Sequence, residues 1–457
     1  MSVYAASPIR HPDLRAMSLM TRRAWWLVAL NFLIPGSVQV LAGNRKLGRL
    51  GLGATLFTWL LGVLAVLAWF LWRTAALTIV TNSWVLTGVQ LLLALYGILW
   101  LVLTIDTLRL LRLVRAAPGA RFWIAACTVL LLVVSVGTAT AGAYYAGITR
   151  GTLQSIFGNG ASVPPVDGRY NILLLGADAG PDREGLRPDS ISVVSLDAET
   201  GRMTMIGLPR DMRNVPFSDD SPMKELYPDG YRQCDVSACK LNSIYTEADL
   251  RHKDLYPDAA SKTSSAGVEA TKEAAEGITG LDIQYYALID MQGFSALIDA
   301  LGGVEITVEK RLPIGGDENL QGVDEWIEPG TRVLNGYYAQ WYARSRHNTS
   351  DYDRMERQRE LQTAILKQFT PANVLSKFQA IAQAGTQVMR TDIPQDMLGY
   401  FGNLAMKTRE LPTTSVELTP ENSLYPDELD FDDFDAIRAL VRADLYPPTS
   451  TPTPTPE

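Results

Sequence analysis

Histidine and cysteine are scarce in this sequence, with three of each among 457 residues. The histidines, His11, His252 and His347, do not combine with the cysteines at the spacing of a zinc finger. A G-x-S-x-G segment, which marks the nucleophile turn of many serine hydrolases, is also missing. These absences argue against a zinc-finger module and against serine hydrolysis that depends on histidine.

A basic excess is missing as well, because 41 lysines and arginines are outnumbered by 49 aspartates and glutamates, which gives a net charge of -8. No phosphate-binding loop of the Walker or G-x-G-x-x-G type follows a predicted strand. Without a basic excess or a basic recognition helix, nucleic acid is not an expected partner.

Acidic residues are almost absent from the first 150 positions, which contain only Asp13 and Asp106. Three apolar runs in this region, at about 51–72, 84–105 and 122–146, are long enough to cross a hydrocarbon core of about 30 Å at about 1.5 Å per residue. Tryptophan and tyrosine gather at the ends of these runs, as is usual at the headgroup level. Each run is predicted to be a transmembrane helix.

The whole membrane region, residues 24–146, is oriented by its basic residues, which prefer the cytoplasmic side. Three clusters qualify: Arg10, Arg15, Arg22 and Arg23; Arg45, Lys46 and Arg49; and Arg109, Arg112, Arg115 and Arg121. All three lie in the cytoplasm only if 24–43 is a re-entrant or interfacial hairpin, broken at Pro35-Gly36. Residues 1–23 are then cytoplasmic, and the chain after the third crossing is extracytoplasmic. Four full crossings, the alternative, would leave the soluble part inside and one basic cluster outside.

Two of the cysteines, Cys234 and Cys239, share a polar loop within an insertion at 214–239, whereas Cys127 lies in an apolar run. An extracytoplasmic compartment is oxidising, so the pair is expected to form an intramolecular disulfide. Two free thiols are the alternative.

The soluble part begins after a linker expected at 147–168, rich in Gly, Ser and Pro. Tyr170–Gly176 is a continuous apolar run, typical of a strand buried on both faces. Segments 190–196 and 203–208 flank a turn and predict a β-hairpin. Further strands at 285–289 and 304–308 alternate with helices at about 264–278, 291–301 and 353–369. The alternation predicts an α/β fold, an α-β-α sandwich with a mixed central sheet, preceded by the helical transmembrane region.

The domain that carries the chemistry is expected at 169–370. Residues 371–446 are expected to be a helical extension that ends in a helix at 430–445. The tail at 447–457, made mostly of proline and threonine, has too little apolar content to fold and is expected to be disordered.

Charged residues gather at the predicted strand ends and at one helix start. They lie in Leu175-Gly-Ala-Asp178, Arg187-Pro-Asp189, Pro209-Arg-Asp211, Tyr342-Ala-Arg-Ser-Arg346 and Asp353–Gln358. Carboxylates without histidines suit a hard cation such as Mg²⁺. Arginines offer forked donors that match phosphate oxygens. The combination predicts a site that clamps Mg²⁺ and a pyrophosphate.

The spacing of these residues favours convergence. Arg344 and Arg346 are two apart in a segment expected to be extended, so their side chains would point to the same side. Arg354, Arg357 and Gln358 would fall on one face of the predicted helix, with Leu361 continuing the same stripe.

Taken together, the motifs resemble the LytR-CpsA-Psr family, whose domain is also called the cell-envelope-related transcriptional attenuator domain. The resemblance extends from about residue 170 to 369. It rests on NILLLGAD, R-x-D at 187–189, PRDM at 209–212, KLNSIY at 240–245, FSALIDALGGV at 294–304, LNG at 334–336, and ARSR followed by DRMERQ. So many motifs in order are far more specific than any one of them.

The resemblance implies a membrane-anchored, Mg²⁺-dependent phosphotransferase. Its donor would be a glycopolymer on a polyprenyl-pyrophosphate carrier, whose lipid lies in an apolar tunnel between the sheet and the helices, and its acceptor would be peptidoglycan outside the membrane. A peptidoglycan sugar hydroxyl would attack the sugar-linked phosphorus, and polyprenyl phosphate would leave. A lipid-pyrophosphate hydrolase and a non-catalytic envelope sensor are the two alternatives. Only an enzyme needs all the aspartates and arginines to converge.

The resemblance also implies roles for individual residues. Asp178 and Asp189 would hold Mg²⁺. The pyrophosphate and its transition-state charge would be bound by Arg187, Arg210, Arg344, Arg346, Arg354, Arg357 and Gln358. Arg210, Asp211 and Asp353 are the catalytic candidates, with either aspartate orienting an arginine or accepting the proton of the attacking hydroxyl.

Overall fold

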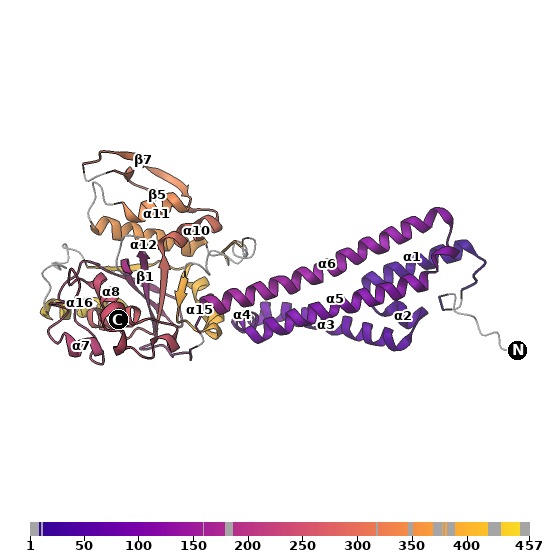
Figure 1. Cartoon of the computed structure of the whole chain (residues 1–457), viewed down its shortest axis with the longest axis horizontal. Helices are drawn as coiled ribbons and strands as arrows, with labels where there is room; N and C mark the ends of the chain where they lie inside the picture. The colour runs from indigo at the N-terminus through magenta and orange to yellow at the C-terminus, as the bar shows by residue number, and fades with distance from the viewer. Residues whose placement is uncertain are drawn as a thin grey trace, which may run out of the picture. The chain divides into compact units, whose positions relative to one another are not determined.

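The computed structural model describes residues 9–10, 12–158, 160–178, 186–316, 319–345, 351–368, 377, 380–381, 389–418 and 431–447. The chain divides into two compact units, Met1–Gly151 and Thr152–Glu457, whose elements are labelled in Figure 1. The tail predicted to be disordered lies, beyond Pro447, outside the described residues.

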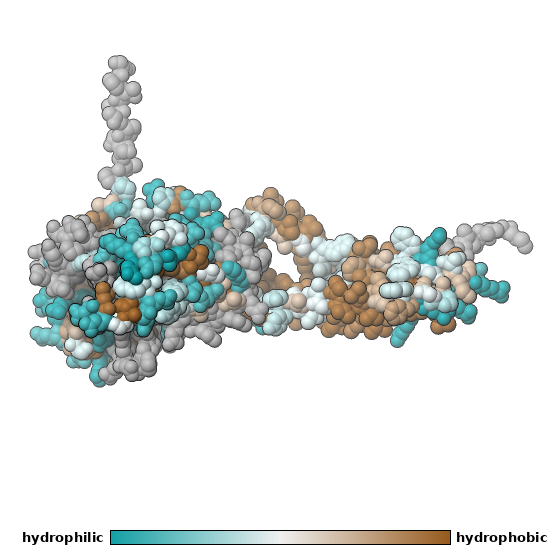
Figure 2. All heavy atoms as spheres, turned by 90° about the horizontal axis from the view of Figure 1, so that it is seen from above, coloured by the Kyte–Doolittle hydropathy of each residue, from teal (hydrophilic) through white to brown (hydrophobic). Residues whose placement is uncertain are grey.

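The first unit is built from helices. They are α1 (Met17–Leu33), α2 (Ser37–Ala42), α3 (Arg45–Leu71), α4 (Arg73–Thr81), α5 (Ser83–Leu111), a 3-10 turn at Leu113–Arg115 and α6 (Pro118–Ile156). Three helical stretches, Arg45–Leu71, Ser83–Arg115 and Pro118–Ile156, are long and apolar enough to cross a membrane. Figure 2 shows hydrophobic side chains gathered over these helices. So large an exposed apolar surface fits a lipid bilayer and supports a membrane anchor.

Pro35 and Gly36 separate α1 from α2, inside the segment expected to be re-entrant. Gly36 has a φ of +93°, in the left-handed region. A Cβ atom at this position would lie 2.2 Å from the backbone nitrogen of Leu52 in α3. Only glycine can take this conformation so close to a neighbouring helix. The predicted break is present, while the path of this segment relative to a membrane stays a prediction.

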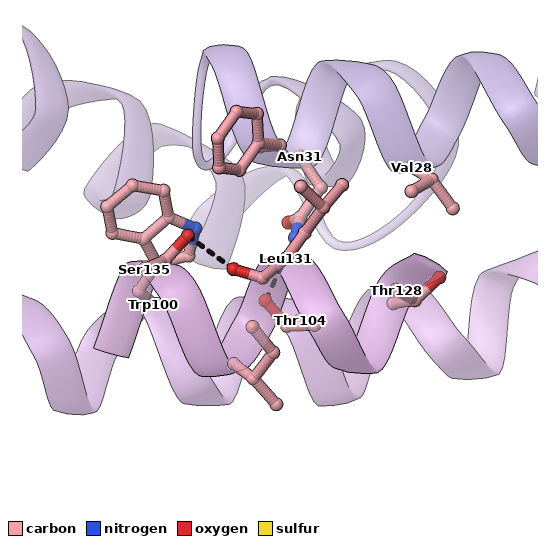
Figure 3. A pocket seen from close by; sticks show the side chains of 9 residues that line it. Val28, Asn31, Trp100, Thr104, Thr128, Leu131 and Ser135 are labelled. Carbon is pink, nitrogen blue, oxygen red and sulfur yellow. Dashed lines mark hydrogen bonds between the residues drawn. The ribbon is translucent and has the colours of Figure 1, made fainter. Parts of the chain in front are cut away.

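Polar side chains join α1 and α2 to α5. Asn31 Nδ2 donates to Thr104 Oγ1 at 2.9 Å, and Asn31 Oδ1 accepts from Thr107 Oγ1 at 3.0 Å. Gln39 Nε2 donates to the same Thr107 oxygen at 3.0 Å. In Figure 3, Asn31 and Thr104 border a small pocket that Ser135 of α6 also lines. Because unpaired polar groups are costly among apolar helices, this network fixes the broken segment against α5.

The linker begins later than the predicted position 147, because α6 continues to Ile156. The first proline after the apolar run is Pro164, and a single glycine in 148–156 does not stop the helix. Past the helix, Gly158 donates its backbone N–H to the carbonyl of Ile393 at 3.0 Å. The linker is therefore shorter than expected and is held by the second unit at its start.

The second unit is organised around a mixed sheet of six strands in the order β10-β3-β2-β1-β4-β9. The strands are β1 (Arg169–Asp178), β2 (Arg187–Asp197), β3 (Met203–Leu208), β4 (Tyr285–Asp290), β9 (Met389–Thr391) and β10 (Thr414–Glu417). β1 pairs with β2 antiparallel and with β4 parallel. The predicted hairpin is confirmed as the antiparallel pair β2–β3.

Side chains of β1 alternate between two faces of the sheet, and both faces are covered. Leu173 and Leu175 belong to a core completed by α8 (Leu241–Arg251), α9 (Ala266–Thr279) and α16 (Phe431–Leu445). Tyr170 and Ile172 pack on the other face against α15 (Leu398–Thr408). On that same face, Leu366 of α12 (Asp351–Gln368) packs on β2 and β3. The predicted α-β-α sandwich with a mixed sheet is confirmed.

The C-terminal part is not the purely helical extension that we expected over 371–446. β9 adds to β4 antiparallel, and β10 adds to β3 parallel, so this part supplies both edge strands of the sheet. Strands of three and four residues are too short for a period of two to be recognised. The helix expected at 430–445 is present as α16.

A second, smaller core lies on the side of α12 away from the sheet strands. It contains α10 (Met291–Leu301), the pairs β5 (Val304–Val308) with β8 (Gly330–Leu334) and β6 (Leu312–Gly315) with β7 (Val323–Ile327), and α11 (Gly336–Arg344). Leu361, Ala364 and Ile365 of α12 pack into this core. α12 is therefore shared, with one side toward the central sheet and one toward the small sheets, as seen in Figure 1.

Candidate functional site

The charged motifs meet at one end of three neighbouring strands. Asp178 closes β1 and pairs in register with Arg187, the first residue of β2. Ile191 of β2 pairs with Leu208, the last residue of β3. Because both pairs are antiparallel, the end of β1, the start of β2 and the end of β3 lie side by side. The backbone alone brings the motifs of Asp178, Asp189 and Arg210 together.

Arg210 is held by carboxylates on two sides. It forms an ion pair with Asp189, and its Nε lies 3.4 Å from Asp211 Oδ2. The other Asp211 oxygen accepts from Lys240 Nζ at 2.8 Å. The Arg210 side chain is mostly buried, with 16% exposed, so its guanidinium is oriented before any ligand arrives. This geometry favours a role for Asp211 in orienting Arg210 over a role in accepting the proton of the attacking hydroxyl.

A narrow pocket lies between these strand ends and α12. It is lined by Asp189, Ser190, Ile191, Ser192, Gly207, Leu208, Arg210, Arg354, Met355, Gln358, Arg359 and Gln362. Four of the predicted site residues, Asp189, Arg210, Arg354 and Gln358, therefore line one pocket. A Cβ at Gly207 would lie 3.0 Å from Met355 Cε, so the small residue lets α12 approach the sheet here.

The pocket holds buried polar groups suited to a polar ligand. Arg354 is only 3% exposed, which places a cation in the wall. Ser192 Oγ and Gln362 Oε1 are buried and have no hydrogen-bond partner among the described residues. Buried polar atoms are normally paired, so these two mark places where a ligand or water would complete the hydrogen bonding.

Arg357 lies in α12 close to these residues but is not among those that line the pocket. Its Nε donates to the carbonyl of Tyr342 at 2.9 Å, and its Nη2 donates to the carbonyl of Ser345. Burial lowers the pKa of the Arg357 guanidinium, and the nearby Tyr342 and Asp353 oppose that shift. Arg357 therefore holds the end of α11 against α12.

The residues predicted to share one polar face of α12 therefore lie on two different sides of the helix. Gln358 reaches the pocket and also donates to the Ala343 carbonyl at 3.1 Å, whereas Arg357 and Leu361 serve the second core. A helix buried on two sides has no single inward face, which is why one stripe did not describe it. Asp353 is half-buried near Arg357 and is not among the pocket residues.

The extended segment predicted around Arg344 is wrong, because Arg344 is the last residue of helix α11. Asn335 begins this helix by accepting from the backbone N–H of Tyr338 at 3.0 Å. Its buried positions, Gly336, Ala339, Tyr342 and Ala343, have helical spacing. Arg344 is exposed and is not among the pocket residues. Arg346 and the side chain of Asp178 lie outside the described residues.

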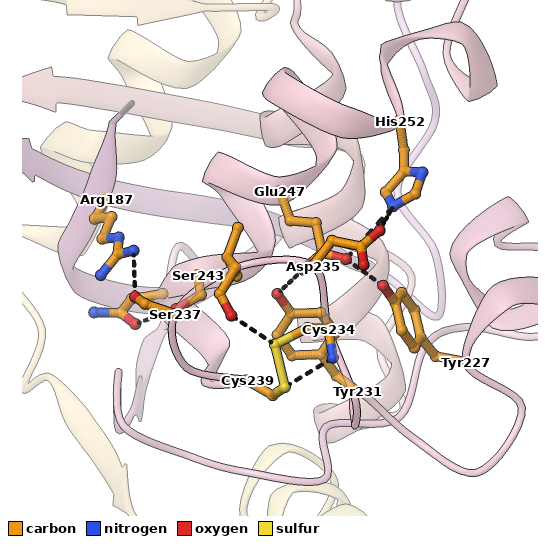
Figure 4. Close-up of a disulfide and its surroundings, with 12 residues drawn as sticks. Arg187, Tyr227, Tyr231, Cys234, Asp235, Ser237, Cys239, Ser243, Glu247 and His252 are labelled. Carbon is orange, nitrogen blue, oxygen red and sulfur yellow. Dashed lines mark hydrogen bonds and ion pairs between the residues drawn. A yellow bond between two sulfur atoms is a disulfide. The ribbon is translucent and has the colours of Figure 1, made fainter. Parts of the chain in front are cut away.

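The disulfide loop approaches the site through Arg187. The structure contains the disulfide between Cys234 and Cys239 that we predicted. Within the loop that it closes, Ser237 Oγ accepts from Arg187 Nη2 at 3.2 Å. Figure 4 shows this contact beside the disulfide. The insertion is therefore a neighbour of the strand ends.

Several residues of the site were not predicted. Ser192 and Gln362 line the pocket without belonging to a recognised motif, and Arg359 joins them although it is five residues beyond Arg354. Asp290 closes β4 and pairs in register with Ala177, next to Asp178. In the sequence, Asp290 could have been recognised as a further carboxylate of this site from its position directly after a predicted strand.

A wider pocket also borders Arg359. It lies between α12, β5 and residues 411–415, and its walls include Glu305, Glu356, Glu360 and Lys367. These charges make it unlike the apolar lipid tunnel that the resemblance implied.

The end of the mixed sheet carries Asp189 and Arg210 and is opposed by Arg354 and Arg359 of α12, an arrangement on an α/β domain that suits an anionic ligand. The chain belongs to the LytR_cpsA_psr family, whose sequence model matches residues 134–433.

Named relatives agree with this membership. The chain is 27% identical to Biofilm regulatory protein A of Streptococcus mutans, over 56% of this chain and 59% of the relative. It is 27% identical to the polyisoprenyl-teichoic acid–peptidoglycan teichoic acid transferase TagV of Bacillus subtilis, over 62% and 67%. It is 26% identical to the cell wall biosynthesis protein LcpA of Corynebacterium glutamicum, over 66% and 61%. The match thus spans about three fifths to two thirds of each relative.

Solved structures include crystal structures of two Bacillus subtilis proteins, TagV and TagT. TagV is 24% identical, with a TM-score of 0.43 over 61% of this chain and 98% of the other. TagT is 19% identical, with a TM-score of 0.39 over 62% and 94%.

Proposed function

We propose that this protein is a membrane-anchored transferase that moves a glycopolymer from a polyprenyl-pyrophosphate carrier onto peptidoglycan. The observation that carries the proposal is the single pocket that Asp189, Arg210, Arg354 and Gln358 line together. A sensor has no need for such convergence. The names of TagV and LcpA support the substrate class, since they describe teichoic acid transfer to peptidoglycan and cell wall biosynthesis.

The reaction would be a phosphoryl-type transfer. The oxygen of a peptidoglycan hydroxyl would form a bond to the sugar-linked phosphorus, and the bond from that phosphorus to the bridging oxygen would break. Polyprenyl phosphate leaves with the bridging oxygen, and the hydroxyl proton passes to a base, for which Asp211 and Asp353 are the two candidates. Arg210 and Arg354 would neutralise charge on the phosphoryl oxygens, which is the main catalytic need of such a transfer.

Mg²⁺ fits this end of the sheet as the cofactor. Asp178 and Asp189 belong to adjoining strand ends, and carboxylate oxygens are the ligands that Mg²⁺ prefers. We propose that these two residues hold the ion. When bound, it would supply positive charge to the pyrophosphate oxygens.

The test is a product analysis of the full-length protein in detergent, with a polyprenyl-pyrophosphate-linked glycopolymer as donor. With peptidoglycan present, we expect polymer joined to peptidoglycan by a phosphodiester, and polyprenyl phosphate in equal amount. Cleavage of the donor at the same rate without peptidoglycan would instead identify a hydrolase. If the donor stays intact both with and without peptidoglycan, the hypothesis of a non-catalytic sensor would be the one that remains.

We further propose that the protein crosses the membrane three times and that the second unit is extracytoplasmic. The number of spanning candidates, the clusters of basic residues and the disulfide in the second unit support this arrangement.

Cysteine labelling in intact cells tests the orientation. In a Cys127→Ser background, Val80→Cys between the first two spans should react with an impermeant maleimide, whereas Lys46→Cys should react only after lysis. Both positions are exposed in the folded unit, so a difference would report the side of the membrane. Labelling of Lys46→Cys from outside would contradict the three-crossing arrangement.

A further inference from the structure

Asp235, Glu247 and His252 form a compact cluster on the second unit, outside the pocket at the strand ends. One potential ligand atom from each lies within 4.8 Å of the others. His252 Nε2 is 3.5 Å from Glu247 Oε1 and 4.0 Å from Asp235 Oδ2. Figure 4 shows the imidazole directed toward the two carboxylates. None of the three residues has a part in the proposed transfer.

The fold brings these residues together from two segments. Glu247 lies on α8, and His252 is the residue that ends this helix, with a φ of -127°. Five residues apart on a regular helix they would face about 140° apart, but the change of direction at the helix end turns His252 back toward Glu247. Asp235 comes from the loop closed by the Cys234–Cys239 disulfide, which fixes it beside α8.

Glu247 is prepared as a ligand by its surroundings. It is fully buried, and the hydroxyls of Tyr227 and Tyr231 donate one hydrogen bond to each of its oxygens. Burial raises the pKa of both tyrosine hydroxyls, and the Glu247 carboxylate raises it further, so both remain donors. Each carboxylate oxygen has a second lone pair, so Oε1 can still bind a cation. Metal-binding carboxylates are usually oriented by such outer hydrogen bonds.

His252 Nε2 is a buried atom without a hydrogen-bond partner among the described residues. Its separations of 3.5 Å and 4.0 Å from the carboxylate oxygens are long for hydrogen bonds. The 3.5 Å separation is close to the distance of about 3.3 Å between two ligands placed about 2.0 Å from a tetrahedral metal, and the 4.0 Å separation is about 0.7 Å longer. A buried nitrogen without a hydrogen bond, facing two carboxylates, is the arrangement that an ion between the three side chains would complete.

We propose that Asp235, Glu247 and His252 bind a divalent cation of the zinc type. A neutral imidazole favours zinc over Mg²⁺ or Ca²⁺, and two carboxylates balance the charge of the ion. Three protein ligands leave a fourth position for water. The ion would join the disulfide loop, which also contacts Arg187 through Ser237, to α8. Its role is to fix this loop beside the site, separately from the Mg²⁺ proposed there.

The test is metal binding by the full-length oxidised protein in detergent. After removal of metals with EDTA, Zn²⁺ is titrated in competition with a chromophoric chelator. We expect one tightly bound Zn²⁺ per chain and a rise in melting temperature on binding. His252→Ala and Asp235→Asn should each weaken binding at least tenfold. Because the Asp235 side chain is 68% exposed, its replacement by asparagine should leave the metal-free melting temperature unchanged.

A matched control is Asp254→Asn, which removes an exposed carboxylate two residues from His252 and should leave zinc affinity unchanged. The proposal is overturned if the wild-type protein binds no zinc at micromolar concentration, or if Asp235→Asn and His252→Ala bind it as well as wild type. Equal loss in Asp254→Asn would also overturn it, because general negative charge would then explain the binding. None of these outcomes depends on transfer activity.

Discussion

Replacing Arg210 with lysine is expected to slow polymer transfer by on the order of 100-fold or more. Lysine keeps the charge but cannot present two parallel donors, while the pocket positions the guanidinium of Arg210 between Asp189 and Asp211. The rate of donor consumption in the detergent assay measures the effect, and the melting temperature shows whether the fold is kept.

Arg311→Lys is the control for this substitution. Arg311 lies away from the pocket, on the small sheets, where it pairs with Glu328 at 2.9 Å and stacks over Trp326. The same change there should leave transfer unaltered. Near-normal transfer by Arg210→Lys would remove the forked guanidinium from the mechanism and weaken the case for an anion clamp.

Arg357→Ala is expected to lower the free energy of unfolding of the second unit by about 3 kcal/mol. The substitution leaves the carbonyls of Tyr342 and Ser345 without their donor and opens a space beside α12, where Arg357 is only 8% exposed. Denaturant unfolding followed by tryptophan fluorescence, with Trp341 on the neighbouring helix, measures the change.

Arg344→Ala provides the comparison, since it removes an exposed arginine from the end of the same helix α11. Its effect on unfolding should stay within about 0.5 kcal/mol. If both variants unfold alike, Arg357 does not hold α11 against α12, and a direct role in binding the ligand becomes the better explanation of its burial.

The strong periodic patterns in the sequence were sufficient to predict the sandwich. The apolar run at Tyr170–Gly176 and the turn between 190–196 and 203–208 gave β1 and the β2–β3 hairpin, because buried strands and tight turns are local features. The short edge strands β9 and β10 could not be found in this way. They are strands because of the partners that they pair with, which are more than 90 residues away.

The site was predictable where a motif sits at a strand end. Asp189 and Arg210 met as expected, because antiparallel pairing fixes which ends adjoin. The directions in which the arginine side chains of α12 point could not be predicted from their spacing alone. Arg357 and Arg354 are only three residues apart, yet one supports the backbone of α11 and the other lines the pocket, since α12 is packed on both sides.

The cluster of Asp235, Glu247 and His252 shows a further limit of predicting sites from the spacing of residues in the sequence. No zinc motif is visible in the sequence, because Glu247 lies within α8, His252 follows the last residue of this helix and Asp235 belongs to a separate loop. Sequence distance does not reveal that a disulfide and a helix terminus place them together.

Both edges of the central sheet are formed by strands that follow all the other strands of the chain. Until residues 389–417 arrive, β3 and β4 present unpaired backbone N–H and C=O groups, the kind of edge that promotes pairing with other chains. The helices that are long and apolar enough to span a membrane precede the sheet, so they are synthesised while the sheet is still incomplete. A chain that stops at residue 370 would lack β9 and β10 and would keep both edges exposed.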